Sequence, residues 1–264
     1  MDLSPAIVSW NPRGLNDPAK RDSVREFISN ISANLVCIQE TKMELVDRYV
    51  VSQCLGPAFD DFSFLPAVGT RGGILLAWDS TVLSVSNISL HSFSITREAK
   101  YKEGGSWWIT AVYGLQDNEA KIQFLAELEV RRSLCPGPWL LIGDFNMILC
   151  AADKNNGNLD RANMARFRAF VNKLELKEMY MHGRTFTWSN ERCTPTMTRI
   201  DRALVSIDWE LRYPDALLQA LSSSVSDHTP LHLSMTAMNR PAKRFKFELF
   251  WLKLEGFEDA VKEG

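Results

Sequence analysis

The sequence predicts an α/β fold, in which buried strands alternate with amphipathic helices. Strand, helix and strand patterns follow one another within about the first forty residues, as they do in α/β proteins. The composition is that of an ordinary globular chain, since 45% of the 264 residues are apolar and 23% are charged. A chain of this length forms one large domain or two small ones, and it buries a sizeable core without disulfides.

The first part of the chain carries the strand–helix–strand pattern. Residues 6–10 form a short apolar strand, and a turn follows at residues 11–14. A helix is predicted to start at Asp17 and Pro18, because aspartate caps helices and proline is favoured at their first position. Its apolar face has helical spacing and consists of Val24, Phe27, Ile28 and Ile31. A second strand at 35–38 then ends at Gln39 and Glu40.

The rest of the chain continues the alternation. Further strands are predicted at 73–78, 82–90, 107–113, 139–142, 185–188, 200–204 and 231–235. One helix is predicted at 119–132, where Ile122, Leu125 and Leu128 share a face. Another carries an apolar face made of Phe167, Phe170, Val171 and Leu174. An Asn- and Gly-rich loop at 154–160 precedes that helix.

Charge and cysteine content exclude several classes of protein. The formal charge of −2 excludes a polycation that coats nucleic acid by charge alone, although it leaves room for a local basic face. An odd number of cysteines without a CxxC pair argues against a disulfide framework and a thiolate zinc site. Neither a signal peptide pattern nor a bilayer-spanning apolar run is present. We therefore expect a soluble monomer in the reducing nuclear or cytoplasmic compartment, without a membrane partner.

The composition shifts near residue 237. We expect residues 1–237 to form one domain and residues 238–264 to form a basic-aromatic tail, the start of a linker to a downstream region. The tail interleaves aromatic residues with Arg240, Lys243, Arg244 and Lys246. These four cations either contact DNA phosphates or belong to a solvated linker, and the sequence leaves both interpretations open.

Polar residues stand where several predicted strands end. Asn11, Glu40, Tyr113 and Asp144 each follow or close an apolar strand, and strand ends gather along one rim of an α/β fold. Asp201, Asp227 and His228 come later in the chain. Each residue alone is better explained as a turn former, a helix cap or an ion-pair partner. As a set without cysteine, they suit a hard cation such as Mg²⁺, which proteins commonly use in phosphate chemistry.

Six short motifs in a fixed order resemble the endonuclease/exonuclease/phosphatase superfamily. They are SWN at 9–11, IQET at 38–41, VYG at 112–114, GDFN at 143–146, RIDR at 199–202 and SDH at 226–228. The chain is most similar to the endonuclease of plant LINE-type non-LTR retrotransposons, on the segments WNPRGLN at 10–16, RGGI at 71–74, TFTWSN at 185–190 and FKFE at 245–248. This resemblance implies a DNase I-like, four-layered α/β sandwich, with two mixed sheets face to face and helices outside. It also implies a reverse transcriptase downstream in a longer parent chain.

The same resemblance implies a metal site and a general base. Glu40 would hold Mg²⁺, or Mn²⁺ in its place, with the amide oxygen of Asn11 nearby. Asp227 would act on the metal or leaving-group side. Asp144, held by Asn146, would orient and deprotonate the attacking water.

The substrate phosphate would be met by several side chains, according to this resemblance. His228, oriented by Asp201, would stabilise the negative charge that develops on the phosphoryl oxygen. Tyr113 would donate a hydrogen bond to the same phosphate. The expected substrate-binding residues are thus Asn11, Tyr113, Asn146 and His228.

The function expected from these motifs is Mg²⁺-dependent nicking of DNA. Two alternatives stay open: a phosphatase or lipid phosphodiesterase built on the same site, and a catalytically idle retrotransposon remnant. The chain departs from the superfamily pattern at two positions. Arg13 stands where many members carry an acidic residue, which is usual in the retrotransposon group, and Leu115 stands where proline is common.

Overall fold

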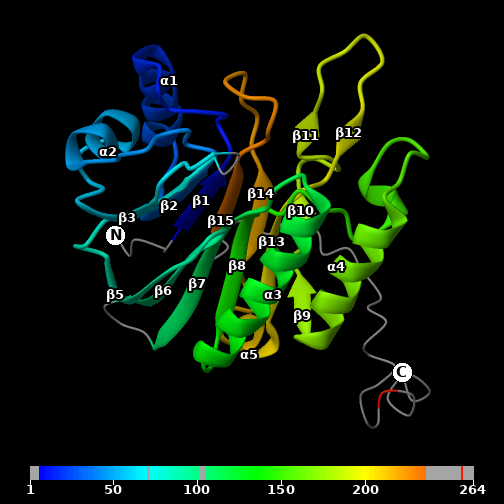
Figure 1. Ribbon diagram of the computed structural model, residues 1–264. Helices are drawn as coiled ribbons and strands as arrows, with labels where there is room; N and C mark the ends of the chain where they lie inside the picture. Colours follow the sequence, from blue (N-terminus) through cyan, green and yellow to red (C-terminus); the bar gives the residue numbers. More distant parts are fainter. Residues whose placement is uncertain (1–5, 70–71, 102–104, 236–256, 258–264) are drawn as a thin grey trace.

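A computed structural model of the protein describes residues 6–69, 72–101, 105–235 and Phe257. In this part of the chain, two β-sheets face each other and helices cover their outer sides (Figure 1). One sheet has the order β10-β14-β15-β1-β2-β4-β3, and the other has the order β5-β6-β7-β8-β13-β9. The four-layered α/β sandwich expected from the sequence is confirmed.

The strands of the first sheet are β1 (Ala6–Trp10), β2 (Leu35–Gln39), β3 (Asp61–Leu65), β4 (Ile74–Trp78), β10 (Met181–His182), β14 (Leu217–Ala220) and β15 (Leu231–Ser234). Those of the second are β5 (Leu83–Leu90), β6 (Ser94–Tyr101), β7 (Ser106–Tyr113), β8 (Trp139–Asp144), β9 (Leu176–Glu178) and β13 (Asp201–Ser206). A small ribbon pairs β11 (Trp188–Ser189) with β12 (Met197–Thr198). Both large sheets are mixed, because β1 runs parallel to β2 and antiparallel to β15, and β8 runs parallel to β7 and antiparallel to β13.

The helices are α1 (Pro18–Ser29), α2 (Arg48–Leu55), α3 (Asn118–Leu134), α4 (Arg161–Lys173), α5 (Ile207–Arg212) and the short 3₁₀ helix η1 (Ala151–Asp153). Aspartate side chains cap the first four. The carboxylate of Asp17 accepts a hydrogen bond from the backbone N–H of Ala19 at 3.0 Å, and Pro18 occupies the first turn. The start predicted for this helix is confirmed.

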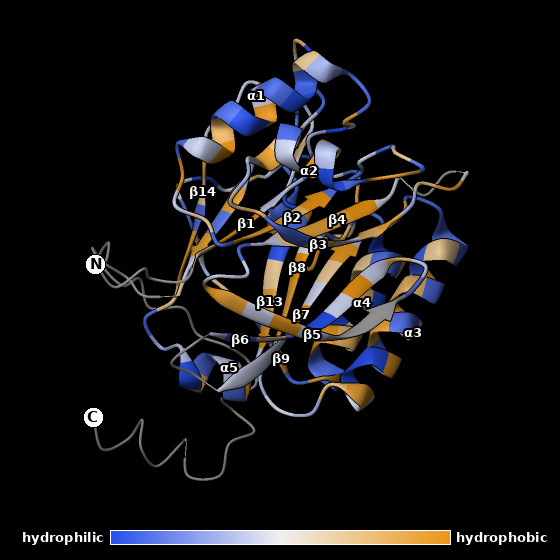
Figure 2. Ribbon diagram, turned by 90° about the vertical axis from the view of Figure 1, so that its left-hand side faces the viewer, coloured by the Kyte–Doolittle hydropathy of each residue, from blue (hydrophilic) through white to orange (hydrophobic). Residues whose placement is uncertain are grey.

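The core is divided among three apolar layers. Between the sheets, Ile7 and Leu35 of one sheet belong to the same buried cluster as Ile109 and Leu140 of the other. Outside the first sheet, Trp10 and its neighbours pack beneath α1 and α2, and a third cluster lies beneath α3 and α4. Figure 2 shows apolar strands at the centre and polar outer surfaces on the helices. Because both faces of the central strands are buried, these strands form unbroken apolar runs in the sequence.

Several elements were not anticipated from the sequence. The strands β3, β6 and β14 and the helices α2 and α5 are short or rich in polar residues, so their apolar period is weak. The predicted strand at 185–188 is wrong except for Trp188, which begins β11. The proposed tail at 238–264 lies outside the described residues apart from Phe257. Among the described helices, none has the length and apolar character needed to cross a bilayer.

Candidate active site

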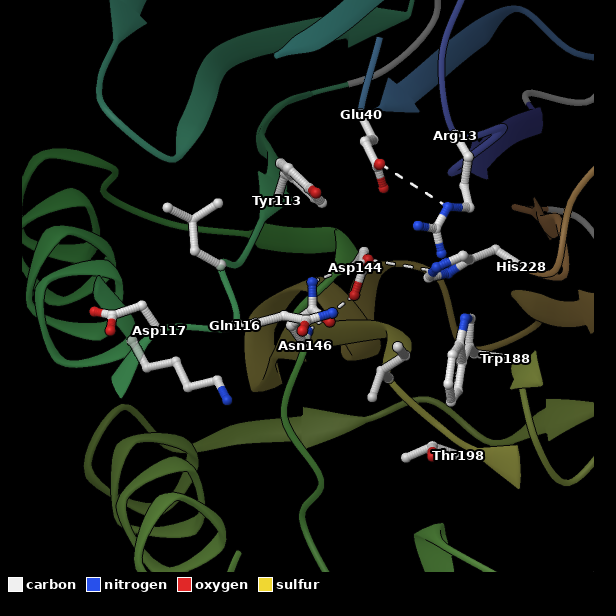
Figure 3. Close-up of a pocket in the computed structure, with 13 residues that line it drawn as sticks. Arg13, Glu40, Tyr113, Gln116, Asp117, Asp144, Asn146, Trp188, Thr198 and His228 are labelled. Atoms are coloured by element: carbon white, nitrogen blue, oxygen red, sulfur yellow. Dashed lines mark hydrogen bonds and ion pairs between the residues drawn. The ribbon is translucent and has the colours of Figure 1, made fainter. Parts of the chain in front are cut away.

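The ends of four strands from both sheets meet at one rim of the sandwich. Asn11 and Glu40 directly follow the parallel strands β1 and β2 of the first sheet. Tyr113 and Asp144 end the parallel strands β7 and β8 of the second sheet, and the two residues are in register. Asp201 begins β13 opposite Asp144. The expected gathering of polar residues at strand ends is therefore present, and it forms across two sheets (Figure 3).

Asn11 joins the two carboxylates that come from different sheets. Its fully buried Nδ2 donates to Glu40 Oε2 and to Asp144 Oδ2, at 3.1 Å each. Its oxygen, expected beside the metal, instead accepts the backbone N–H of Arg13 at 3.0 Å. In this structure Asn11 therefore holds the carboxylates of Glu40 and Asp144 close together through its amide nitrogen.

Asp144 lies in a buried position that favours its protonated form. Its carboxylate accepts the backbone N–H of Asn146 at 2.9 Å, and the side-chain amide of Asn146 lies 3.3 Å away. Burial, together with the negative charge of Asp201, raises the pKa of Asp144 to about 7, although His228 and these hydrogen bonds lower it. A carboxylate that takes up a proton near neutral pH has the basicity that a general base requires.

His228 and Asp201 form a buried pair. The Nδ1 atom of His228 lies 3.0 and 3.2 Å from the two carboxylate oxygens of Asp201, so the contact expected between these residues is present. Burial alone lowers the pKa of His228, but the charge and hydrogen bond of Asp201 outweigh it and raise that pKa to about 9. His228 is therefore an imidazolium at neutral pH, and Asp201 fixes the orientation of its ring.

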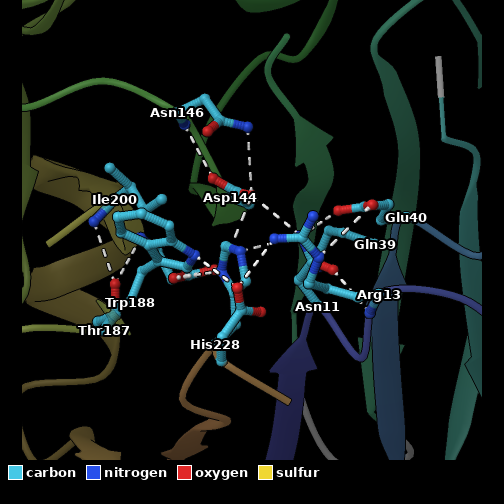
Figure 4. A network of polar contacts seen from close by, with 12 residues as sticks. Asn11, Arg13, Gln39, Glu40, Asp144, Asn146, Thr187, Trp188, Ile200 and His228 are labelled. Carbon is cyan, nitrogen blue, oxygen red and sulfur yellow. Dashed lines mark hydrogen bonds and ion pairs between the residues drawn. The ribbon is translucent and has the colours of Figure 1, made fainter. Parts of the chain in front are cut away.

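Thr187 holds Asp201 in place and was not identified from the sequence. Its buried Oγ1 accepts the backbone N–H groups of both Ile200 and Asp201, at 3.0 Å each. Its carbonyl accepts the N–H of Thr229, directly after His228. One threonine thus connects the start of β13, which carries Asp201, to the segment that carries His228. Figure 4 shows the contact of Thr187 with Ile200 beside Asp144 and His228. The only local signal was its place in the segment TFTWSN.

Asp227 contacts cationic and aromatic donors. Its Oδ2 accepts from Arg13 Nη1 and from the indole Nε1 of Trp188, at 2.9 Å each. Arg13, noted above as a departure from the superfamily pattern, also reaches towards Glu40, with 3.9 Å between Nε and Oε1. A second cation, Lys42, lies 3.0 Å from the same oxygen of Glu40 and was not singled out from the sequence.

Tyr113 is half-buried beside Glu40. Burial and the negative charges of Glu40 and Asp144 raise the pKa of Tyr113 far above its usual range. The phenol therefore keeps its proton and can donate a hydrogen bond to an acceptor that enters the cavity.

These residues border a cavity of about 530 Å³. Glu40, Tyr113, Asp144, Asn146 and His228 line it, and the structure adds Arg13, Leu115, Gln116, Asp117, Lys121, Trp188, Thr198 and Ile200. Asn11, Asp201 and Asp227 contact the lining residues from behind. The four tail cations Arg240, Lys243, Arg244 and Lys246 lie outside the described residues.

The sequence profile of the Endonuclease/Exonuclease/phosphatase family matches residues 8–228. The chain belongs to this family. Family members hydrolyse phosphoester bonds and generally use divalent metal ions. The match spans all six superfamily motifs, from SWN at 9–11 to SDH at 226–228.

Solved structures of family members share the fold at low identity. The endonuclease domain of TRAS1, a telomere-specific non-LTR retrotransposon, has a TM-score of 0.61 at 13% identity, covering 89% of this chain and 99% of that domain. The AP endonuclease LMAP of Leishmania major has a TM-score of 0.63 at 17% identity, covering 88% and 87%. The Neisseria 3′ phosphatase NExo, bound to a product DNA hairpin, has a TM-score of 0.66 at 19% identity, covering 87% and 98%. The comparison with curated proteins found no match.

Proposed function

We propose that this protein is a divalent-metal-dependent phosphodiesterase that nicks DNA by water attack on a backbone phosphate. The observation that carries the proposal is the network in which Asn11 joins Glu40 to Asp144 beside the Asp201–His228 pair. It supports the proposal because a carboxylate suited to a metal ion, a carboxylate of raised pKa and a buried imidazolium lie around one cavity.

The donor set fits a hard divalent cation. Glu40 and Asp144 present carboxylate oxygens from opposite sheets towards one point, where the Asn11 amide lies 3.1 Å from both. Oxygen ligands are those that Mg²⁺ prefers, and one or two carboxylates suffice because the ion keeps several waters. Glu40 would hold the ion. When bound, it would neutralise charge on the phosphate oxygens.

Asp144 is the group that accepts the proton of the attacking water. Its carboxylate is fixed by Asn11 and Asn146, so the water would bind in a defined orientation. Asn146 also donates to the carbonyl of Gly114 at 2.7 Å, which ties the end of β8 to the end of β7. Burial and the charge of Asp201 raise the pKa of Asp144 to about 7, so this carboxylate is a stronger base than an ordinary aspartate and is still partly deprotonated near neutral pH.

His228 and Tyr113 act on the phosphate oxygens. The imidazolium of His228 would stabilise the charge that builds up in the pentacovalent transition state, and Asp201 keeps the ring charged and oriented. Tyr113 remains protonated and would donate to a neighbouring phosphate oxygen. Asp227 would act indirectly, by holding Arg13 and Trp188 at the rim.

DNA is the substrate that the available similarities favour. The sequence segments shared with plant LINE-type endonucleases and the common fold of the TRAS1 domain support it. Arg13, Lys121 and His228 give the cavity cations that can contact a polyanion, beside the carboxylates of Glu40, Asp117 and Asp144. A reverse transcriptase downstream in a longer parent chain is part of the same proposal.

A panel of substrates tests the proposal. The purified protein is incubated with Mg²⁺ and supercoiled plasmid, a 3′-phosphorylated oligonucleotide or sphingomyelin vesicles. We expect nicked plasmid as the main product, and none from the variant Asp144→Asn. Faster release of inorganic phosphate from the oligonucleotide would identify a phosphatase, and phosphocholine release would identify a lipid phosphodiesterase. Inactivity on all three, with a correctly folded protein, would support an idle remnant.

A further inference from the structure

Both oxygens of the metal-binding carboxylate are already engaged by this chain's own donors. Oε2 of Glu40 accepts from the amide of Asn11 at 3.1 Å. Oε1 faces two cations, with Lys42 Nζ at 3.0 Å and Arg13 Nε at 3.9 Å. A divalent cation that binds Glu40 must therefore share this carboxylate with Lys42 and Arg13 or displace them.

The two cations are exposed, whereas the carboxylates they contact are covered. The side chains of Arg13 and Lys42 are 45% and 47% exposed, against 12% for Glu40 and 17% for Asp227. Ion pairs with such exposed partners are weak, because water screens them and the long side chains lose entropy when held. The carboxylates thus stay in place while the cations are free to exchange partners.

The local backbone directs both cations to Glu40. Arg13, Glu40 and Lys42 have positive φ angles of 61°, 52° and 56°. Residues other than glycine seldom adopt this backbone conformation. Hydrogen bonds between the two turns hold this geometry, from Leu15 N–H to the Thr41 carbonyl and from the Asn16 amide to the Lys42 carbonyl.

Gly14 leaves the space that the Lys42 side chain occupies. A Cβ atom at this position would lie 3.3 Å from Lys42 Cδ, so a larger residue would press against the lysine stem. Several independent features therefore place Lys42 and Arg13 on one carboxylate.

We propose that Arg13 and Lys42 are exchange cations: they neutralise Glu40 and Asp227 in the free protein, and they move to substrate phosphate oxygens when a divalent cation binds Glu40. The ligand class is a phosphodiester anion with its metal ion. The metal ion and the phosphodiester then strengthen each other's binding. The metal ion displaces Arg13 and Lys42 from Glu40, and the phosphodiester gives the two displaced cations new partners. This inference rests on the metal site of the proposed function and adds its regulation.

Direct measurement of Mn²⁺ binding tests the inference without any need for turnover. Isothermal titration calorimetry is performed on wild type, Arg13→Gln, Lys42→Gln and Glu40→Gln. The control is Lys173→Gln, which removes an equal charge at the end of α4, where exposed Lys173 pairs with Glu129 of α3. Each titration is repeated with dimethyl phosphate, a phosphodiester that the protein need not cleave.

Without dimethyl phosphate, Arg13→Gln and Lys42→Gln should each tighten Mn²⁺ binding on the order of tenfold, because a repelling charge about 5 Å from the ion is removed. Lys173→Gln should change it less than about twofold. Dimethyl phosphate should tighten Mn²⁺ binding in wild type and in Lys173→Gln. It should tighten Mn²⁺ binding less in Arg13→Gln and Lys42→Gln.

Two results separate failure of this inference from failure of the metal site. If Glu40→Gln leaves Mn²⁺ affinity unchanged, the metal binds elsewhere, and the proposed metal site is overturned together with the inference. If Glu40→Gln weakens binding while Arg13→Gln and Lys42→Gln do not tighten it, only the inference is overturned. If dimethyl phosphate tightens Mn²⁺ binding in Arg13→Gln and Lys42→Gln as much as in wild type, the proposed movement of these cations to the substrate is overturned.

Discussion

Replacing Asp201 with asparagine should slow nicking in a pH-dependent way. In the wild type, the charge of Asp201 lies 3.0 Å from His228 Nδ1 and raises the pKa of His228 to about 9. Asp201→Asn removes this charge. Burial remains and lowers that pKa, whereas Asp144 and Asp227 still raise it, so we take the variant's histidine to titrate near its ordinary value of about 6.5.

The size of the effect follows from the two pKa values. At pH 8, His228 is about 90% charged in the wild type and about 3% charged in the variant, which gives a defect of about 30-fold. At pH 6 both histidines are largely charged, and the defect shrinks to less than about twofold. The pKa of Asp144 also falls when Asp201 is neutralised, which reduces the defect at pH 6 further.

The assay compares initial rates of plasmid nicking for wild type and Asp201→Asn at pH 6 and pH 8, with Mg²⁺ in excess. The ratio of the two defects should be about 20. His228→Ala alone should cost roughly 10²–10³ in rate, and Asp201→Asn should add almost nothing in that background. A defect of equal size at both pH values, or strictly multiplicative losses in the double variant, would refute the coupling between Asp201 and His228.

Three further predictions concern the pH profile, a buried hydroxyl and the tail. The nicking rate should rise with pH as Asp144 loses its proton near pH 7, and it should fall as His228 loses its proton near pH 9. A nicking rate that is constant from pH 6 to 10 would contradict both assignments. Thr187→Val should lower the free energy of unfolding by about 2 kcal/mol and should slow nicking, because two buried N–H groups lose their acceptor. Thr187→Ser keeps the hydroxyl and should retain most of the stability and of the nicking rate. An unchanged nicking rate in Thr187→Val would exclude a positioning role for this residue. Neutralising the four basic tail residues should flatten the salt dependence of DNA binding with little change in stability, and an unchanged slope would favour the linker interpretation.

The sequence predicted elements whose signals are local. The start of α1 was predictable because Asp17 caps the helix and Pro18 fits its first turn. The central strands were predictable because they are buried on both faces and therefore form apolar runs. By contrast, β6 carries Arg97, Glu98 and Lys100, and its pairing with β5 and β7 depends on contacts that no local pattern records.

The candidate site was predictable to the extent that each residue belongs to a motif at a strand end. Asp144, Asp201 and His228 were identified in this way, and the structure places them within reach of one another. Thr187 was missed because its role comes from a hydroxyl that accepts the backbone N–H of Asp201, 14 positions further along the chain. Lys42 was missed because its contact with Glu40 accompanies positive φ angles at both residues, which no local sequence pattern indicates.

The most direct test of the account is the metal dependence of nicking in wild type and Asp144→Asn, purified in parallel. Supercoiled plasmid is incubated with each protein in Mg²⁺, in EDTA, and in EDTA followed by excess Mg²⁺. We expect wild type to nick plasmid in Mg²⁺, to be inactive in EDTA and to recover when Mg²⁺ is returned. Folded Asp144→Asn should not nick under any of these conditions. Undiminished nicking in EDTA, or normal nicking by Asp144→Asn, would contradict it.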